Sequence, residues 1–441
     1  MTARQAAFKA LSAHSKTGVW TDTVLNSVLS REDLSERDAA LASRLFYGVV
    51  QNMTLCDWYI AAFSSVKLFK MQPQVLGILR LSVYQLVFLS KIPVNAAVNE
   101  GVELAKQYAN PRATSFVNAV LRKLSANLEH LPPVVADTEA TRLSILYSHP
   151  EWLVRAFIAR LGGDGAEALL KINNEPADMT AAVNTLKTDA QSLIESLNAE
   201  NDDAQKHPWL ENCLILKNTH RLDRLMAFRD GLFYIQDPAA MLAVKASAPK
   251  PGMFVIDGCA APGGKSFAAG ILMEDDGRIL SCDIRDKKLG RIQDSADRLG
   301  IKCIETSRVD ARQPDETLFG KADIVIADVP CSGLGIIRKK PEIRYKNPEE
   351  LKAMPKLQLM FLQNLSKYVR PGGVLLYATC TVLQCENEDV AKEFLKANAD
   401  FQPEPFCLPE PIGEVGTGMM TLWPHLHATD GFFICKLRRV S

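Results

Sequence analysis

The chain has 441 residues, too many for one ordinary hydrophobic core, so two or three domains are expected. Hydrophobic residues make up 47% and charged residues 23%, which is typical of a globular protein. The formal net charge is zero, which excludes attraction of the whole chain to nucleic acid and leaves only a local basic patch for such binding.

Residues 1–135 are predicted to form a compact helical bundle. Apolar residues recur at helical spacing in the segments 41–51, 75–89, 96–108 and 114–127. Pro73, Pro93 and Pro111 mark breaks between these helices, and no strand-like alternation interrupts them. A linker containing two prolines begins at Leu131 and closes this region.

Residues 136–235 are predicted to form a connecting region with a small α+β subdomain. Short helices are expected over residues 140–173. Strand-like segments follow near Thr180, Leu214 and Leu232, and a helix is expected over 190–197.

Residues 236–441 alternate between strands and helices, which predicts a Rossmann-like, doubly wound α/β domain with a parallel sheet. The predicted strands are Met253–Asp257, Arg278–Asp283, Ile301–Thr306, Asp323–Asp328, Val374–Thr379 and Gly431–Leu437. The predicted helices are Lys265–Met273, Lys287–Leu299 and Leu351–Val369. Ligands of such sheets bind at the carboxyl ends of the strands, so Asp257, Asp283, Asp328 and Cys380 should share one edge.

A glycine-rich loop, Asp257-Gly-Cys-Ala-Ala-Pro-Gly-Gly-Lys-Ser, follows the first predicted strand and opens a helix. A phosphate loop would need glycine where Cys259 stands, and Pro262 also argues against it. A dinucleotide fingerprint starting at Gly258 would need glycine where Ala260 stands. Neither pattern is complete.

The third interpretation of the loop is S-adenosylmethionine, which carries an amino acid and a nucleoside but no phosphate. Such a loop needs small residues and an acid near the methionyl ammonium, and Asp257 meets that need. Asp283, at the second strand end, is placed to accept both ribose hydroxyls, and Asp310, after the third strand, to contact the adenine edge. Three acids in this order favour the cofactor over unrelated surface acids.

Two cysteines, Cys331 and Cys380, follow the carboxyl ends of successive predicted strands. A single cysteine there is more often a buried, inert thiol. Two at the edge that carries the cofactor loop suit methylation of a pyrimidine carbon, because thiolate addition to C6 of cytosine makes C5 able to accept a methyl group. Asp328 could protonate or hydrogen bond cytosine N3, and the base must be splayed or flipped out. These residues indicate two reactive thiols but do not show which of them is the nucleophile.

Together these segments resemble the Fmu/Sun family of bacterial small-subunit ribosomal RNA (cytosine-C5) methyltransferases. The motifs that carry the resemblance are Gln236-Asp-Pro-Ala-Ala, Asp257-Gly-Cys-Ala-Ala-Pro-Gly-Gly-Lys, Asp328-Val-Pro-Cys-Ser-Gly, Tyr377-Ala-Thr-Cys-Thr and Thr429-Asp-Gly-Phe-Phe. Residues 37–49 resemble the NusB-like RNA-binding domain that this family carries at its N-terminus.

The resemblance implies roles for individual residues. Cys380 would be the nucleophile and Cys331 would assist product release. The family usually has serine after the nucleophile, and Thr381 keeps a hydroxyl there. The residues implied to bind S-adenosylmethionine or line its pocket are Cys259, Ala260, Ala261, Pro262, Gly263, Gly264, Lys265, Asp283, Asp310 and Asp328. The implied substrate is one cytosine of 16S ribosomal RNA.

A basic run, Ile337-Arg-Lys-Lys-Pro-Glu-Ile-Arg-Tyr-Lys, follows Cys331 closely. Arg338, Lys339, Lys340 and Arg344 are predicted to contact RNA phosphates, although a solvated loop is the alternative.

Other classes of protein fit the sequence less well. An amino-methyltransferase would have an N-P-P-[YF]-type motif where Asp328-Val-Pro-Cys stands, and a non-catalytic factor would not need the loop, the acids and both thiols. The ten cysteines lack metal-site or disulfide spacing, so no metal is expected. The N-terminus lacks a signal-peptide apolar run, and segment 75–89 is too short to span a membrane. A cytoplasmic, monomeric protein without a membrane partner is expected.

Overall fold

A computed structural model describes residues 1–441 except 18–19, 33, 218, 220 and 314, and the chain divides into two compact units. The helical unit comprises Met1–Glu175 together with Ile337–Lys346. The sheet unit comprises Pro176–Ile336 and Asn347–Ser441. Within the described residues, every helix is too short or too polar to cross a membrane.

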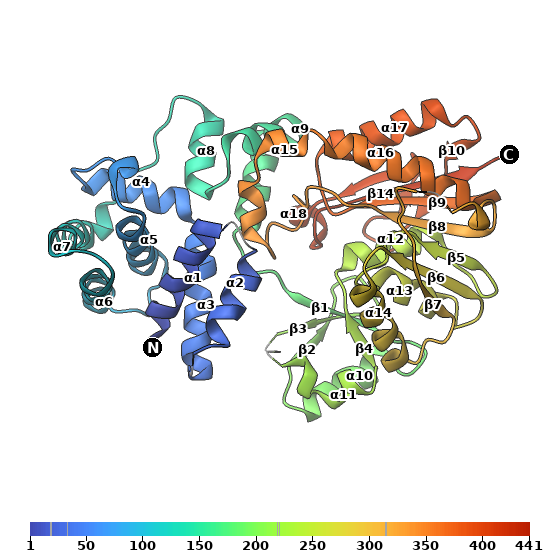
Figure 1. Ribbon diagram of the computed structural model, residues 1–441, viewed down its shortest axis with the longest axis horizontal. Coiled ribbons are helices and arrows are strands. Elements are labelled where there is room, and N and C mark those ends of the chain that lie inside the picture. The colour runs from blue at the N-terminus through green and yellow to red at the C-terminus, as the bar shows by residue number, and fades with distance from the viewer. Residues whose placement is uncertain (18–19, 33, 218, 220, 314) are drawn as a thin grey trace. The chain divides into compact units, whose positions relative to one another are not determined.

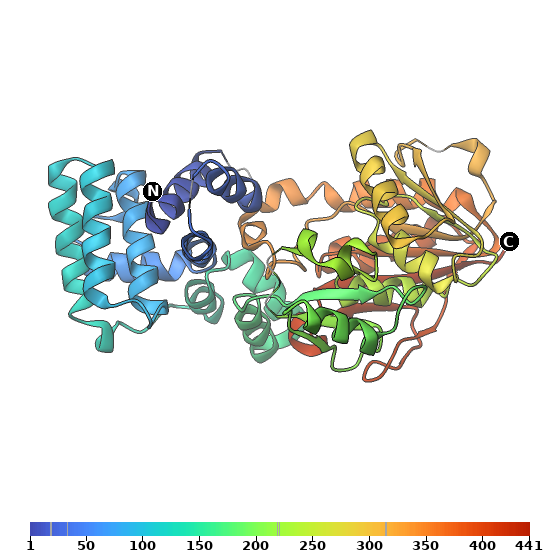
Figure 2. The same cartoon turned by 90° about the horizontal axis from the view of Figure 1, so that it is seen from below.

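The helical unit confirms the predicted all-helical N-terminal region (Figure 1). Pro73 and Pro111 occupy the first turns of α5 and α7, where a missing N–H costs nothing. Helices α5, α6 and α7 pack side by side (Figure 2) around a buried apolar cluster. The helices are α1 (Ala3–Thr17), α2 (Thr21–Leu29), α3 (Glu36–Gln51), α4 (Met53–Phe63), α5 (Pro73–Phe88), α6 (Val94–Tyr108), α7 (Pro111–Ser125), α8 (Glu139–Tyr147) and α9 (Glu151–Ile172), with 3-10 turns η1 (Leu68–Lys70), η2 (Leu128–His130) and η5 (Pro341–Tyr345).

A small antiparallel sheet opens the sheet unit and confirms the predicted α+β piece. Its strands lie in the order β2 (Ala204–Lys206), β3 (Cys213–Leu216), β1 (Met179–Val183) and β4 (Phe233–Ile235). Helices α10 (Ala190–Ala199) and α11 (Met226–Arg229) contribute Leu193 and Ala227 to its apolar core. Strand β2 was not predicted, because it has three residues and two of them are exposed.

The large sheet has the strand order β10-β14-β9-β8-β5-β6-β7, and β13 also pairs with β14. Five strands are parallel: β5 (Phe254–Asp257), β6 (Arg278–Asp283), β7 (Ile304–Arg308), β8 (Ala322–Asp328) and β9 (Val369–Thr379). The other three are antiparallel: β10 (Phe401–Pro403), β13 (Met419–Leu422) and β14 (Phe432–Arg439). The five parallel strands confirm the predicted doubly wound sheet, and β14 at its end is antiparallel, because it returns from β13 without a crossover helix of the length a parallel pair needs.

Helices cover both faces of the large sheet, as expected for a doubly wound fold (Figure 1). Side chains of a strand alternate between the faces. In β8, Ile324 and Ile326 join the core beneath α12 (Pro238–Ser247), α13 (Gly264–Leu272) and α14 (Asp286–Leu299). Val325 and Ala327 join the core beneath α16 (Met354–Leu365) and α17 (Glu388–Ala397). The five parallel strands consequently end at one shared edge.

Some connecting elements differ from the prediction. The helix expected over Leu351–Val369 is split into α15 (Pro348–Leu351), α16 and the 3-10 turn η6 (Ser366–Tyr368). Pro355 lies in the first turn of α16, where its ring tolerates a helix start but not a helix interior. The remaining short elements are η3 (Leu222–Arg224), η4 (Glu316–Leu318), η7 (Gln384–Glu386), β11 (Phe406–Cys407), β12 (Glu414–Val415) and α18 (Pro424–His427).

Candidate active site

The loop after β5 is held against the ends of two neighbouring strands. The N–H of Gly258 donates to the carbonyl of Ile326 at 2.9 Å, and the N–H of Ala260 donates to the carbonyl of Cys282 at 2.8 Å. Gly263 has φ of +108°, which favours glycine, and it directly precedes α13. The loop therefore presents small residues and backbone at the carboxyl edge of the sheet.

A cavity of about 760 Å³ opens at this edge, which is a usual size for a small-molecule site. It is lined by residues that follow all five parallel strands. The predicted site residues among them are Cys259, Ala261, Asp283, Asp310, Asp328, Cys331 and Cys380. The structure thus brings together side chains that are far apart in the sequence.

The carboxylates in the cavity fit a ligand rich in hydroxyl and amino groups. Asp283 Oδ2 lies 3.2 Å from Lys288 Nζ, and Asp310 Oδ2 lies 2.7 Å from a guanidinium nitrogen of Arg312. The Arg312 guanidinium also lowers the pKa of Asp310, so this acid is an ionised acceptor at neutral pH. Ionised carboxylates accept hydrogen bonds from ribose hydroxyls and an adenine amine, so the residues present suit S-adenosylmethionine.

Asp257 lies beneath the loop, away from the lining of the cavity. Its side chain is buried, and its Oδ2 accepts the hydroxyl of Ser266 at 2.8 Å. Ser266 in turn accepts the hydroxyl of Ser281 at 2.8 Å. Burial raises the pKa of Asp257 to about 6. One carboxylate oxygen therefore links the first turn of α13 to β6 through Ser266, and the contact of Asp257 with a methionyl ammonium stays a prediction.

The other predicted loop residues support the lining without forming it. Ala260, Pro262, Gly263, Gly264 and Lys265 lie in the loop and the start of α13 but are not among the residues that line the cavity. Their place fits a role in shaping the backbone.

Lys265 and Asp328 form an ion pair, with 2.5 Å between Nζ and Oδ2. Burial lowers the pKa of Lys265, but the carboxylate of Asp328 more than offsets it, and the pKa is raised overall. Cys380 is among the groups whose charge acts on this ammonium. Lys265 therefore stays cationic in its pair with Asp328.

Cys331 and Cys380 are free thiols with their sulfur atoms 3.2 Å apart, well beyond the 2.05 Å of a disulfide. The hydrogen bond to Cys380, burial and the nearby carboxylates of Glu386 and Asp328 hold the pKa of Cys331 well above its usual range. Cys331 is therefore a neutral thiol at physiological pH. The two sulfur atoms are close enough for one thiol to hydrogen bond the other.

The buried carboxylate of Glu386 joins the two cysteine loops. Its side chain is 1% exposed, and Oε2 accepts the backbone N–H of Ser332 and the amide of Gln358, both at 2.8 Å. Oε1 lies 3.4 Å from the hydroxyl of Thr381, which is 2.8 Å from the hydroxyl of Ser332. Ser332 follows Cys331 and Thr381 follows Cys380, so one side chain fixes the spacing of both thiols. The hydroxyl of Thr381 takes part in this network.

The backbone segments at Gly335, Cys380 and Gly431 cross closely and support the same arrangement. The N–H of Gly335 donates to the carbonyl of Cys380 at 2.9 Å, and the N–H of Gly431 donates to the carbonyl of Gly335, also at 2.9 Å. A Cβ on Gly335 would lie 1.8 Å from the carbonyl oxygen of Gly431. Only glycine fits at this crossing.

Sequence reasoning missed Glu386, Gln358 and Gly335. The only signal for Glu386 was the polar run Cys385-Glu-Asn-Glu shortly after Cys380. The sequence of such a run does not distinguish a buried acid from an exposed one. Gln358 lies within the predicted helix and carried no signal of its own.

The basic run after Cys331 does not form one surface. Its residues Ile337–Lys346 belong to the helical unit, and Arg344 is 0% exposed there. Burial lowers the pKa of Arg344 to about 10, so it remains cationic. Its guanidinium lies within hydrogen-bond distance of acceptors on Pro341, Gln51, Tyr147, Ser148, His149, Asn173 and Asn174. The prediction that Arg344 contacts RNA is therefore replaced by an anchoring role, because its donors are occupied by the protein.

Arg344→Met is expected to destabilise the helical unit by about 3 kcal/mol or more, because several buried acceptors lose their donor. Chemical unfolding followed by circular dichroism measures this loss. Lys339→Met, on an exposed neighbour, is the control and should leave unfolding unchanged. Unaltered unfolding of Arg344→Met with weakened RNA binding would restore the original prediction.

The doubly wound sheet, the small-residue loop, the strand-end acids and the paired thiols define a methyltransferase class that combines S-adenosylmethionine with cysteine chemistry. Residues 244–438 match the family described as 16S rRNA methyltransferase RsmB/F, residues 1–126 match the NusB family, and residues 149–223 match the ferredoxin-like domain of RsmF/B-like methyltransferases. The chain belongs to the RsmB/F family of 16S rRNA methyltransferases.

Relatives match over the full length of the chain. A Bacillus subtilis protein named probable ribosomal RNA small subunit methyltransferase B is 36% identical, with 99% of this chain and 98% of the relative covered. A Synechocystis protein of the same name is 32% identical, and both chains are fully covered. The crystal structure of PH0851 matches with a TM-score of 0.79 and 26% identity, covering 99% of this chain and 98% of that one.

These matches confirm three predictions. The family is the one that the motifs resembled, and the fold combines a NusB-like helical region, a small α+β domain and a Rossmann-like catalytic domain. The predicted activity, S-adenosylmethionine-dependent methylation of cytosine C5 in 16S rRNA, is that of the family.

Proposed function

We propose that the chain methylates C5 of one specific cytosine in 16S rRNA through covalent addition of Cys380 to C6. The observation that carries this proposal is the 3.2 Å separation of two thiols in the cavity that also holds the strand-end acids. Attack needs a thiolate. The hydrogen bond to Cys380, burial and nearby acids hold the pKa of Cys331 high, and attack is assigned to Cys380 as the family resemblance implies.

Other residues of the chain take part in base contact, methyl transfer and product release. Asp328, which lines the cavity, contacts cytosine N3 as the protonated acid or through a water that donates to N3, so that negative charge building on the ring is stabilised. S-adenosylmethionine supplies the electrophilic methyl group when bound. A water in the cavity then takes the proton from C5, the electron pair of the C5–H bond re-forms the C5–C6 double bond, and the sulfur leaves C6 as the thiolate of Cys380. The neutral thiol of Cys331 donates a hydrogen bond to the departing sulfur of Cys380, which lowers the barrier to release.

Other roles are part of the same proposal. Cys259 to Lys265, Asp283, Asp310 and Asp328 bind the cofactor or shape its pocket, and Arg338, Lys339 and Lys340 contact RNA. The functional divisions are a helical RNA-binding domain at 1–135, a connecting region at 136–235 and a catalytic domain at 236–441, supported by the three family matches. The enzyme acts as a monomer in the cytoplasm, where its ribosomal substrate is assembled.

Incubating the purified protein with 16S rRNA and labelled S-adenosylmethionine tests this function. We expect 5-methylcytosine at a single position, found by nuclease digestion, mass spectrometry and bisulfite sequencing. Cofactor binding is measured separately by isothermal titration calorimetry. A methylated exocyclic amine would support an amino-methyltransferase instead, and absence of both product and cofactor binding would indicate a non-catalytic factor.

A further inference from the structure

An exposed tryptophan in the helical unit lies close to two lysines of the basic run. Trp20 precedes α2, and its side chain is 47% exposed. The Nζ atom of Lys340 lies 5.2 Å from the centroid of this ring, and that of Lys346 lies 5.6 Å from it. All three residues belong to the helical unit. A large aromatic ring left in solvent beside two ammonium groups has the composition of a nucleic-acid contact.

Internal contacts hold this cluster in place. Glu342 Oε1 accepts the backbone N–H of Thr21, the residue after Trp20, at 3.1 Å. The hydroxyl of Tyr345 donates to the carbonyls of Val50 and Ser148 at 3.1 and 3.2 Å. Arg344 anchors the same segment through its buried guanidinium. The backbone on both sides of Glu342 is thus fixed, so Lys340 and Lys346 are presented to the ring by an ordered segment.

Two acids near the cluster are engaged within the helical unit. Glu342 accepts the N–H of Thr21, and Asp22 accepts the hydroxyl of Tyr47 at 2.5 Å. An exposed aromatic ring beside two ammonium groups suits a polyanion with flat groups better than an acidic-peptide or apolar partner.

We propose that Trp20, Lys340 and Lys346 form a stacking platform for an unpaired base of the RNA substrate. This inference rests on the proposed function and locates one of its RNA contacts. The base would stack on the exposed part of the indole, and the lysines would pair with the flanking phosphates. An unpaired nucleotide is required, since both faces of a base within a duplex are already covered by its neighbours.

Fluorescence anisotropy with a single-stranded 16S rRNA fragment tests the platform in the full-length protein. Trp20→Ala is expected to weaken RNA binding about 10-fold, and Trp20→Phe should retain most of the affinity because it keeps an aromatic face. Lys340→Gln and Lys346→Gln should each reduce the slope of log affinity against log salt by about 0.7. The KM for S-adenosylmethionine should stay unchanged in all four variants.

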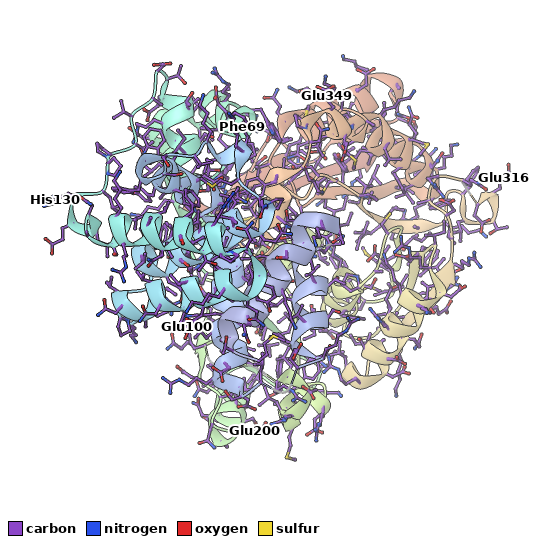
Figure 3. All side chains as sticks on the ribbon, turned by 60° about the vertical axis from the view of Figure 1, so that its left-hand side comes forward. Phe69, Glu100, His130, Glu200, Glu316 and Glu349 are labelled. Carbon is purple, nitrogen blue, oxygen red and sulfur yellow. The ribbon has the colours of Figure 1, made fainter. Side chains whose placement is uncertain are left out.

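Phe69 offers a matched control in the same unit. Its side chain is 79% exposed, and Lys70 Nζ lies 6.0 Å from its ring, but no second lysine lies over the ring among the described cation–π contacts. Figure 3 labels this residue. Phe69→Ala should leave RNA affinity within about twofold of wild type. Equal losses in Phe69→Ala and Trp20→Ala would overturn the proposal, because any exposed aromatic would then suffice.

Two further results would also overturn it. One is unchanged RNA affinity in a folded Trp20→Ala protein, checked by thermal unfolding. The other is a salt slope lowered by the lysine variants without any effect of Trp20, which would indicate phosphate contacts alone. Failure of the proposed function is separable, because it would appear as absence of 5-methylcytosine with the wild-type enzyme.

Discussion

Cys331→Ala is expected to accumulate a covalent complex between the protein and 16S rRNA. The variant keeps Cys380, the Lys265–Asp328 pair and the cavity acids, so addition to C6 and methyl transfer can proceed. It lacks the thiol that lies 3.2 Å from the departing sulfur and assists release. Denaturing gel electrophoresis of the reaction should show a slowly migrating band that contains both protein and RNA, with multiple turnover strongly reduced.

Cys380→Ala is expected to give the opposite pattern. Methyl transfer should fall by at least about 10⁴-fold, in line with the loss of a nucleophile in other enzymes, and no adduct should form. Binding of S-adenosylmethionine should persist, because the carboxylates that would hold it remain. Cys407→Ala, on an exposed thiol in β11, is the matched control and should behave as wild type.

The double variant separates the two roles further. Without Cys380, loss of Cys331 should add nothing, because release cannot fail when no bond has formed. An adduct in Cys380→Ala but not in Cys331→Ala would reverse the order of the two thiols. Full activity in Cys380→Ala would refute a covalent mechanism in which Cys380 is the nucleophile.

Glu386→Ala is expected to lower kcat by about 100-fold, the usual cost of displacing reacting groups by about 1 Å. The substitution removes the acceptor that holds Ser332 and Gln358, and the two cysteine loops lose their common support. Each buried donor left unpaired costs about 1–3 kcal/mol, so the loops should rearrange. Single-turnover methylation under saturating RNA and cofactor measures the chemical step.

The matched variants distinguish positioning from general damage. Glu386→Gln keeps one acceptor oxygen and should recover part of kcat. Glu393→Ala, on the exposed side of α17, removes a carboxylate whose partner Lys396 is also exposed, and it should have no effect. The KM for RNA should change little in Glu386→Ala, since the loss lies in the chemical step. An unchanged kcat in a folded Glu386→Ala protein would refute the positioning role.

The parts of the fold predicted from the sequence are those with local signals. Helical periodicity and prolines located the bundle, and apolar runs located the five parallel strands, three of which end in aspartate. The strand ends then placed Asp283, Asp310, Asp328 and both thiols in one cavity, because parallel strands share an edge. The direction of the last strand, β14, had no local signal in the sequence, because it depends on how β14 pairs with β9.

The parts that escaped prediction depend on contacts between distant segments. Arg344 looks like a surface cation in the basic run, yet carbonyls from the ends of α3 and α8 surround it. The bond from Ser266 to Asp257, and that from Ser281 to Ser266, also join segments that are apart in the sequence. Burial decides such roles, and burial is set by tertiary packing and not by residue type.

The most direct test of the central claim is to identify the cysteine that bonds to RNA. Fluorine at C5 of cytosine replaces the proton that must leave, so wild-type enzyme should remain bound to 16S rRNA containing 5-fluorocytosine. Protease and nuclease digestion followed by tandem mass spectrometry locates the bond. We predict a methylated 5-fluorocytidine attached to Cys380, whereas attachment to Cys331, or complete absence of an adduct with an enzyme active on normal rRNA, would contradict the account.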